Sequence, residues 1–262
     1  SVIDAAKGAI ALKALKGNQS LLMAHLRNNV PLPKHMDPAQ LLAVPTTSGT
    51  GSEVTQWGTL WGDDKVKHSV SDPRLYPKYA ILDPSLCTSM PSELTISSAL
   101  DALSHAMESV WNKHHTSLSD ELATNSISLI RKYLPLTLGN PENIEFRRYM
   151  QTASIISGLA MGTTQTALAH SISYPFTAKL GLPHGFACSF TLAEVARYNL
   201  KTSSERLRPI AQGLGCSPNC IPEIIEEWLC DLGIGETISK FVSDDFINKL
   251  DDSIISRART AN

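Results

Sequence analysis

The stretch SELTISSALDALSHAMESVW, residues 92–111, places apolar side chains at helical spacing over its whole length. We predict one helix over 92–111, with Ser92 or Thr95 as its N-cap. The same pattern recurs downstream. Further helices are predicted over residues 118–137, 144–161, 165–174, 184–199, 203–214 and 221–232. Because no strand pattern follows residue 84, the second part of the chain is predicted to be all-helical.

The first part of the chain mixes helix and strand. Residues 1–16 read as a helix, and the apolar runs LLAVP (41–45) and YAILD (79–83) read as strands, the second of them buried. QWGTLW and KVKHSV are predicted to pair as a hairpin around a turn at Gly62, Asp63 and Asp64. The fold class is therefore α/β followed by all-α, with the boundary between residues 83 and 92.

Composition excludes several classes of protein. The 262 residues are 42% hydrophobic and 18% charged, which is typical of a globular chain and not of a disordered one. With 23 basic and 25 acidic residues, the net charge is −2. A chain with this charge has no overall positive electrostatic field to attract nucleic acid. No apolar run reaches the ~20 residues that span a bilayer, so no membrane partner is expected.

The cysteines indicate the redox compartment of the protein, and the start of the sequence indicates whether it is part of a longer chain. Five cysteines without disulfide-dense spacing favour a reducing compartment, such as the cytoplasm, and Cys216 and Cys220 read as ordinary thiols. The chain opens at Ser1 directly on a helix, so we expect a fragment of a longer protein.

Asp101 and His105 are the strongest candidates for chemistry. Their spacing of four residues places both on one face of the predicted helix, among alanines and leucines. A carboxylate in apolar surroundings needs a partner, and a divalent transition metal would supply one. The alternative is a surface Asp–His pair of no consequence.

Two more histidines lie among apolar neighbours, His170 in TALAHSISYPF and His184 in GLPHGFACSF. Each alone is compatible with a hydrogen-bonded core histidine. Together with Asp101 and His105 they could supply one oxygen and three nitrogens to a metal that keeps a further position open. The remaining histidines are interpreted as surface residues: His25, His35, His68, His114 and His115.

The loop PTTSGTGSE, residues 45–53, follows a predicted strand and is rich in small hydroxyl side chains. Such a loop can hold phosphate or ribose oxygens, although it can equally be a plain connection. It is neither a Walker loop nor a GxGxxG motif. The N-terminus of the first helix, at Ser1 and Val2, is a second candidate for binding phosphate.

Together these motifs resemble the iron-dependent (group III) alcohol dehydrogenases over essentially the whole chain. SVIDAAK is similar to the end of the family's GGGS-x-x-D-x-A-K loop, and PTTSGTGSEVT to its PTTAGTGSE loop. ALDALSHAMES is similar to the family's metal helix, and ALAHSISYPF and GLPHGFACSF to its two later histidine motifs. The resemblance implies that residues 1–84 are part of a dinucleotide-binding domain and residues 85–262 a helical metal-binding domain like that of dehydroquinate synthase.

The resemblance also implies a set of site residues. The metal ligands would be Asp101, His105, His170 and His184, holding Fe²⁺ or Zn²⁺. NADH or NADPH would contact Ser1, Val2, Thr46, Thr47, Thr50, Thr59 and Lys67. The chain has Tyr174 where family members often carry a further histidine near the substrate, which makes Tyr174 a candidate catalytic residue.

The implied activity is reduction of a small aldehyde to an alcohol. Within the family the motifs look most like those of phosphonoacetaldehyde reductases, which form 2-hydroxyethylphosphonate, so a phosphonate is a candidate substrate. Lys67, Lys179, Ser171 and Ser173 are candidate donors to it. The alternatives are a dehydroquinate synthase-like metal-dependent lyase and an inactive fragment of the dehydrogenase. A homo-oligomer is compatible with the sequence.

Overall fold

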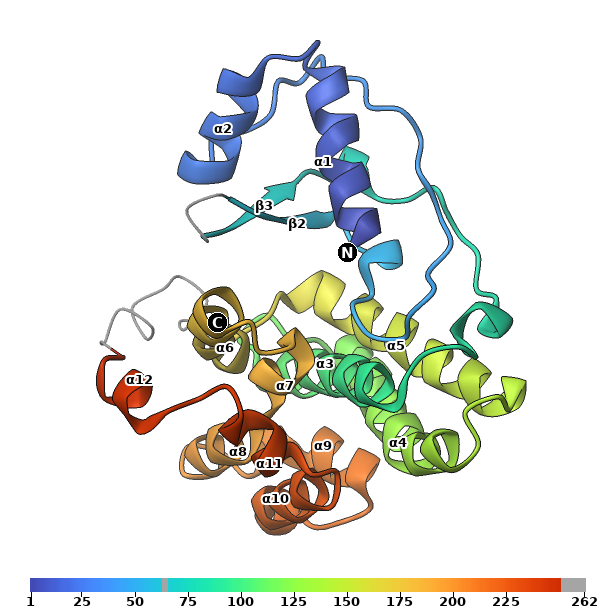
Figure 1. Cartoon of the computed structure of the whole chain (residues 1–262), viewed down its shortest axis with the longest axis vertical. Helices are drawn as coiled ribbons and strands as arrows, with labels where there is room; N and C mark the ends of the chain where they lie inside the picture. Colours follow the sequence, from blue (N-terminus) through green and yellow to red (C-terminus); the bar gives the residue numbers. More distant parts are fainter. Residues whose placement is uncertain (63–65, 251–262) are drawn as a thin grey trace.

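The structure is a computed structural model that describes residues 1–62 and 66–250 (Figure 1). The first part carries the elements α1 (Val2–Ala14), α2 (Gln19–Asn28), β1 (Leu42–Ala43), β2 (Trp57–Trp61), β3 (Lys67–Ser71) and β4 (Tyr79–Ala80). The second part carries α3 (Ser92–Trp111), α4 (Ser117–Gly139), α5 (Ile144–Thr164), α6 (Leu168–Leu180), α7 (His184–Ser189), α8 (Leu192–Leu200), α9 (Arg208–Leu214), α10 (Ile221–Asp231), α11 (Ile234–Ser239) and α12 (Asp244–Asn248). An α/β part therefore precedes a helical part, as predicted.

The predicted hairpin is confirmed. Strands β2 and β3 pair antiparallel, from Trp57 opposite Ser71 to Trp61 opposite Lys67. Gly58 lies where α1 crosses the hairpin. A Cβ at this position would be 2.9 Å from the Asp4 carbonyl oxygen, so a larger residue would push α1 away. Asp63 and Asp64, expected in the turn, lie outside the described residues.

Strands β1 and β4 form a separate parallel pair, with Leu42 opposite Tyr79 and Ala43 opposite Ala80. The prediction of a buried strand over 79–83 is wrong in length and in burial. Only two of its residues are extended, and Tyr79 is 59% exposed. Ile81 and Leu82 are exposed as well, so most of the apolar run faces solvent.

The sequence predicts His25 to be a surface residue, but it is buried. The Ser71 backbone N–H donates to its Nε2 at 3.1 Å, so Nδ1 carries the proton and donates to the Val30 carbonyl at 2.8 Å. His68 is also partly buried, with Nδ1 3.3 Å from the Leu26 carbonyl. These two histidines join α2 to the hairpin and have a structural role.

Helix α3 is the centre of the helical part and has the predicted bounds. Its last thirteen residues, Ala99 to Trp111, are all buried, and it packs against α4, α5 and α7. The predicted caps are wrong: the N-cap is Pro91, without a side-chain hydrogen bond. The Thr95 hydroxyl instead accepts a hydrogen bond from Arg147 at 2.9 Å, which joins α3 to α5.

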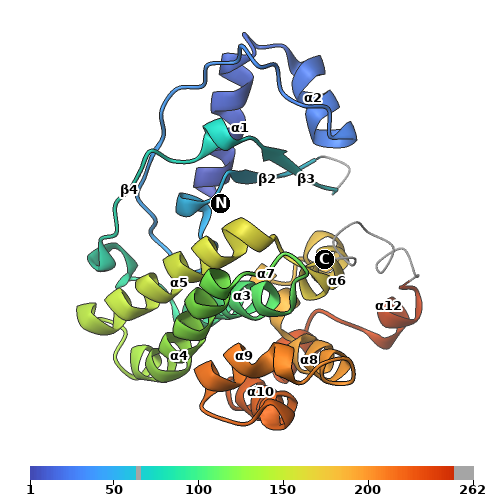
Figure 2. The same ribbon diagram turned by 180° about the vertical axis from the view of Figure 1, so that it is seen from behind.

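Other helices differ from the prediction in their ends. Figure 2 shows how α3 to α10 are arranged in the helical part. Gln165 has a positive φ of 69° and ends α5, so α6 starts only at Leu168 and not at residue 165. Helix α6 then continues through Pro175 to its C-cap Gly181, which has a left-handed conformation. The predicted helix over 184–199 is two helices, α7 and α8, separated where the Phe190 ring packs on Phe176. The sequence did not predict α2, α11 or α12. In the described part of the chain, every helix is too short or too polar to cross a membrane.

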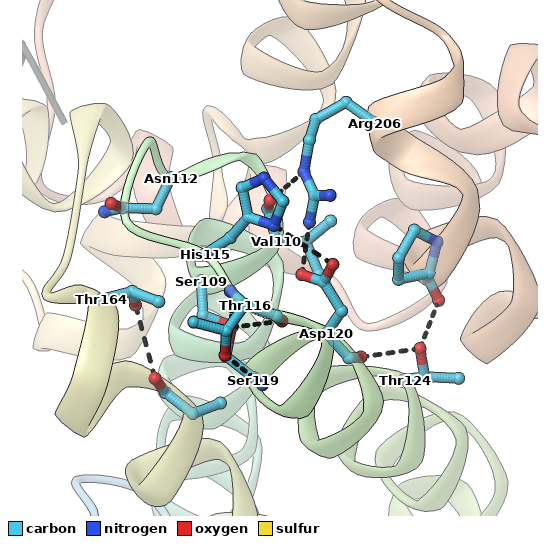
Figure 3. A network of polar contacts seen from close by, with 12 residues as sticks. Ser109, Val110, Asn112, His115, Thr116, Ser119, Asp120, Thr124, Thr164 and Arg206 are labelled. Carbon is cyan, nitrogen blue, oxygen red and sulfur yellow. Dashed lines mark hydrogen bonds and ion pairs between the residues drawn. The ribbon is translucent and has the colours of Figure 1, made fainter.

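Polar contacts fix the C-terminal end of α3 (Figure 3). The Arg206 guanidinium binds the carboxylate of Asp120 and the backbone carbonyl of Val110. The Thr124 hydroxyl donates to the Pro209 carbonyl at 3.0 Å. Together these contacts join α3 and α4 to the segment around α9, and so hold the helix that carries Asp101 and His105.

Gly185 provides a test of the packing between α7 and α3. A Cβ at this position would lie 1.7 Å from the Ser97 carbonyl oxygen, so Gly185→Ala must push α7 away from α3. We expect a loss of about 1–3 kcal/mol in the free energy of unfolding, as for other overpacked sites. Urea denaturation measures the loss.

The matched control is Gly235→Ala in α11, where a Cβ would meet nothing within 4 Å. Alanine is the better helix former, so this variant should be neutral or slightly stabilised. Equal denaturation midpoints for the two variants would contradict the close packing of α7 on α3.

Candidate functional site

Helix α3 places Asp101 and His105 one turn apart on a buried face. Each residue is 5% exposed, and Oδ1 of Asp101 lies 3.6 Å from Nε2 of His105. The segment is rich in alanine and leucine, both strong helix formers, and contains no glycine or proline. The two side chains therefore stand on a rigid support.

Helices α6 and α7 bring two more imidazoles to the same carboxylate oxygen. Nε2 of His170 lies 3.6 Å and Nε2 of His184 lies 3.9 Å from Oδ1 of Asp101. The rings of His105 and His170 stack, with centroids 4.8 Å apart, and the His184 ring meets the edge of His170. The four residues that the sequence singled out, 83 positions apart at their extremes, thus converge on one point.

Three imidazole nitrogens around one buried carboxylate oxygen form a donor set that suits a divalent metal ion. Oδ1 of Asp101 and Nε2 of His170 are buried and have no hydrogen-bond partner, so both lack the contact that an ion would supply. Two ligands about 2.1 Å from one ion, at a tetrahedral angle, lie roughly 3.4 Å apart. The observed separations of 3.6–3.9 Å are close to that value and longer than a good hydrogen bond.

The pKa values of two of the three imidazoles suit metal binding. Although burial lowers it, the pKa of His170 is raised well above its usual range by neighbouring Cys188 and Glu108 and by the contact with Asp101. Desolvation lowers the pKa of His105 to about 4 and that of His184 to about 3, although the charge of Asp101 opposes both shifts. Both imidazoles are therefore neutral at pH 7, which is the form that coordinates metal. Burial alone would raise the pKa of Asp101, but the three histidines lower it below its usual range, so its carboxylate is charged.

Glu108 is a site residue that the sequence reasoning missed. Its carboxylate is fully buried and accepts hydrogen bonds from Nδ1 of His170 at 2.6 Å, from the His170 backbone N–H at 3.1 Å and from the Ala167 backbone N–H at 2.9 Å. It therefore fixes the His170 ring with Nε2 toward Asp101. A signal was present: Asp101, His105 and Glu108 follow the spacing i, i+4, i+7 of one helix face.

Cys188 is a second residue that was missed. It lies one turn after His184 on α7, fully buried, with Sγ 3.5 Å from Nε2 and 3.6 Å from Nδ1 of that histidine. One ligand atom from each of Asp101, His170, His184 and Cys188 lies within 4.8 Å of the others. The Cys188 sulfur is therefore one of the atoms around Asp101 that could bind a metal ion.

A cavity of about 380 Å³ joins this cluster to the α/β part of the chain. The cluster residues Asp101, His105, His170 and His184 line it, as do the PTTSGTGSE loop, the hairpin and the start of α1. Of the predicted nucleotide contacts, five line the cavity: Ser1, Thr47, Thr50, Thr59 and Lys67. Thr46 and Val2 do not, and Val2 is 87% exposed.

Lys7 holds the hydroxyl-rich loop against α1. Its buried ammonium donates to the carbonyl oxygens of Ser52 and Thr55, both at 2.7 Å, and of Trp57 at 2.8 Å. Desolvation lowers its pKa to about 8. The Asp4 carboxylate accepts a further bond from the Ser52 hydroxyl. These contacts explain the Asp and Lys of SVIDAAK as loop anchors.

Lys67 and Tyr174 meet beside the cluster. The Lys67 ammonium lies 4.3 Å from the centroid of the Tyr174 ring, a cation–π distance. Its positive charge also contributes, after desolvation, to the lowered pKa of His105 and of His184. Tyr174 is buried under Lys67 and does not itself line the cavity in the described part of the chain.

The other candidate donors lie apart from this cavity. Lys179 is exposed on α6, and Ser171 and Ser173 are fully buried. All five cysteines are free thiols.

Comparison with known proteins shows the family to which the chain belongs. The family model for iron-containing alcohol dehydrogenases matches residues 1–84, and the model for the C-terminal part of the Fe-containing alcohol dehydrogenase family matches residues 95–249. An NAD-dependent methanol dehydrogenase of Bacillus methanolicus is 38% identical over 67% of the chain and 46% of its own length. A phosphonoacetaldehyde reductase of Streptomyces viridochromogenes is 35% identical over 76% of the chain and 51% of its own length.

A solved structure has the same fold. The chain superposes on sulfoacetaldehyde reductase from Bifidobacterium kashiwanohense, determined with NAD⁺, with a TM-score of 0.84 at 29% identity. The match covers 98% of this chain and 68% of that one. The chain spans about half the length of the curated relatives named above.

Proposed function

Because the chain belongs to the iron-containing alcohol dehydrogenase family, we propose that it acts as part of a metal-dependent, NAD(P)H-linked aldehyde reductase. We propose Asp101, His105, His170 and His184 as the ligands of the divalent ion, Fe²⁺ or Zn²⁺. The observation that supports this most is the approach of three imidazole Nε2 atoms to one buried carboxylate oxygen at the wall of a cavity.

The chemistry divides between bound groups and side chains. A divalent ion polarises a carbonyl as a Lewis acid, and a reduced nicotinamide supplies hydride. Asp101 contributes the one negative charge among the four proposed ligands, which leaves a divalent site at +1. Glu108 orients His170, and Lys7 holds the loop whose Thr47 and Thr50 line the cavity. These residues position the reactants.

For the substrate we propose phosphonoacetaldehyde, reduced to 2-hydroxyethylphosphonate. Three observations support an aldehyde that carries an acidic group. They are the resemblance of the sequence motifs to those of phosphonoacetaldehyde reductases, the overall similarity to one such enzyme, and the position of Lys67 in the cavity wall. We propose that Lys67 attracts the phosphonate while the carbonyl lies toward the metal ligands. It is also one of the residues proposed to contact NADH or NADPH, so its role is tested separately below.

One observation disfavours the lyase alternative. Such an enzyme needs several basic side chains to hold a carboxylate and a phosphate. Among the described residues, Lys67 is the only lysine or arginine that lines the cavity.

The experiment that tests the proposal is an absorbance assay on the metal-loaded protein. We expect oxidation of NADH or NADPH that depends on phosphonoacetaldehyde and stops after chelation. Bound metal without such oxidation would contradict the reductase proposal and favour the lyase or an inactive chain.

Lys67→Met separates binding of the anionic substrate from binding of the cofactor. At saturating cofactor, we expect kcat/KM for phosphonoacetaldehyde to fall by roughly 10–100-fold more than kcat/KM for acetaldehyde. This corresponds to about 1.4–2.7 kcal/mol, as for a charge-assisted contact. The control, Lys179→Met, removes an exposed lysine of α6 and should change neither value. An equal fall in kcat/KM for both aldehydes would show that Lys67 does not bind the phosphonate group.

A further inference from the structure

The cluster around Asp101 offers more donors than the four proposed ligands. Cys188 Sγ reaches the same space from α7, one turn after His184. It is nearly equidistant from both ring nitrogens of His184, at 3.5 and 3.6 Å, so it lies along the lone-pair direction of neither. The sulfur is held beside the ring and close to the point where the other donors meet.

Two sets of four donors therefore overlap. Asp101, His170 and His184 belong to both, and the fourth donor is either His105 or Cys188. The atoms of the set with Cys188 lie within 4.8 Å of one another. Oδ1 of Asp101 and Nε2 of His170, common to both sets, are buried without a hydrogen-bond partner, so they point to a ligand independently of the cysteine.

We propose that Cys188 is a ligand for thiophilic divalent ions, which bind through Asp101, His170, His184 and the Cys188 sulfur. This proposal rests on the metal site proposed above and concerns which of its donors a given ion selects. Thiolate is a soft ligand that favours zinc and its close analogues, whereas the set of three imidazoles and a carboxylate also suits iron. The identity of the ion then decides whether sulfur or His105 completes the coordination.

Coordination by Cys188 involves no redox change. The S–H bond breaks, its proton passes to the buffer, and the sulfur electron pair forms the bond to the ion. The resulting set of one carboxylate, two imidazoles and one thiolate has the tetrahedral donor number of a closed site. An ion held this way is predicted to leave His105 outside its coordination.

Cobalt substitution tests the proposal with a readout that is independent of turnover. The Co²⁺-loaded protein is expected to show a near-ultraviolet thiolate-to-cobalt charge-transfer band together with visible bands of bound cobalt. Cys188→Ser should lose the charge-transfer band while the visible bands remain. Cys87→Ser, which replaces another fully buried cysteine, should keep both.

His105→Ala provides a second variant. It leaves the set with Cys188 intact, so we expect bound cobalt and an unchanged charge-transfer band. Cobalt bound to the wild type without that band, or a band that persists in Cys188→Ser, would overturn the proposal for Cys188 alone. Failure of the wild type to bind cobalt would overturn the metal site itself and this proposal with it.

Discussion

His184→Ala is expected to remove tightly bound metal and to lower the proposed aldehyde-dependent rate on the order of a thousandfold or more. The ion's stabilisation of developing negative charge amounts to several kcal/mol, and each factor of ten corresponds to about 1.4 kcal/mol. His184 is the best of the four residues for this test because its side chain is 32% exposed, whereas those of Asp101, His105 and His170 are 7% exposed or less. Its removal should leave the fold intact.

Metal content after dialysis and the rate with phosphonoacetaldehyde are the two measurements. The matched control is His114→Ala, which replaces an exposed histidine beyond the end of α3 and should change neither. A His184→Ala protein with the metal content and the rate of the wild type would refute the assignment of this ligand.

Glu108→Gln is expected to weaken metal binding by about 10–100-fold, the usual effect of losing the carboxylate behind a metal-bound histidine. The substitution keeps the shape of the side chain but removes its charge. It also places an NH₂ group where the carboxylate accepts from the backbone N–H of Ala167 or His170. The His170 ring then keeps at most a neutral acceptor, which fixes its orientation less well and lowers its basicity as a ligand.

Competition with a chromogenic chelator measures the metal affinity of the Glu108 variant. Glu121→Gln, at an exposed position of α4, is the control for the loss of one carboxylate. Because Glu108 is fully buried, thermal unfolding is measured in parallel. An unchanged metal affinity in a folded Glu108→Gln protein would show that Glu108 does not act through His170.

The sequence predicted those features that depend on local periodicity or on distinctive residue types. The bounds of α3 and the hairpin of β2 and β3 follow from apolar spacing and turn chemistry. Asp101, His105, His170 and His184 could be selected because polar side chains in apolar helices need partners, although only the structure shows that they converge.

What was missed depends on contacts between segments distant in the chain. Glu108 reads as one more acidic residue until α6 places His170 against it. Nothing in the sequence indicates that Lys7 is buried, because the three carbonyl oxygens that surround its ammonium come from residues 52–57. Apolarity alone cannot tell whether another layer covers a strand, which is why the run ending at residue 83 was wrongly expected to be buried.

The central claim is that four side chains from α3, α6 and α7 hold one divalent ion. Anomalous difference density from crystals of the Fe²⁺-loaded protein, recorded on both sides of the iron absorption edge, tests it most directly. The account predicts one peak, about 2.1 Å from Oδ1 of Asp101 and from Nε2 of His105, His170 and His184. No peak at that point, or an iron peak bound by other residues, would contradict it.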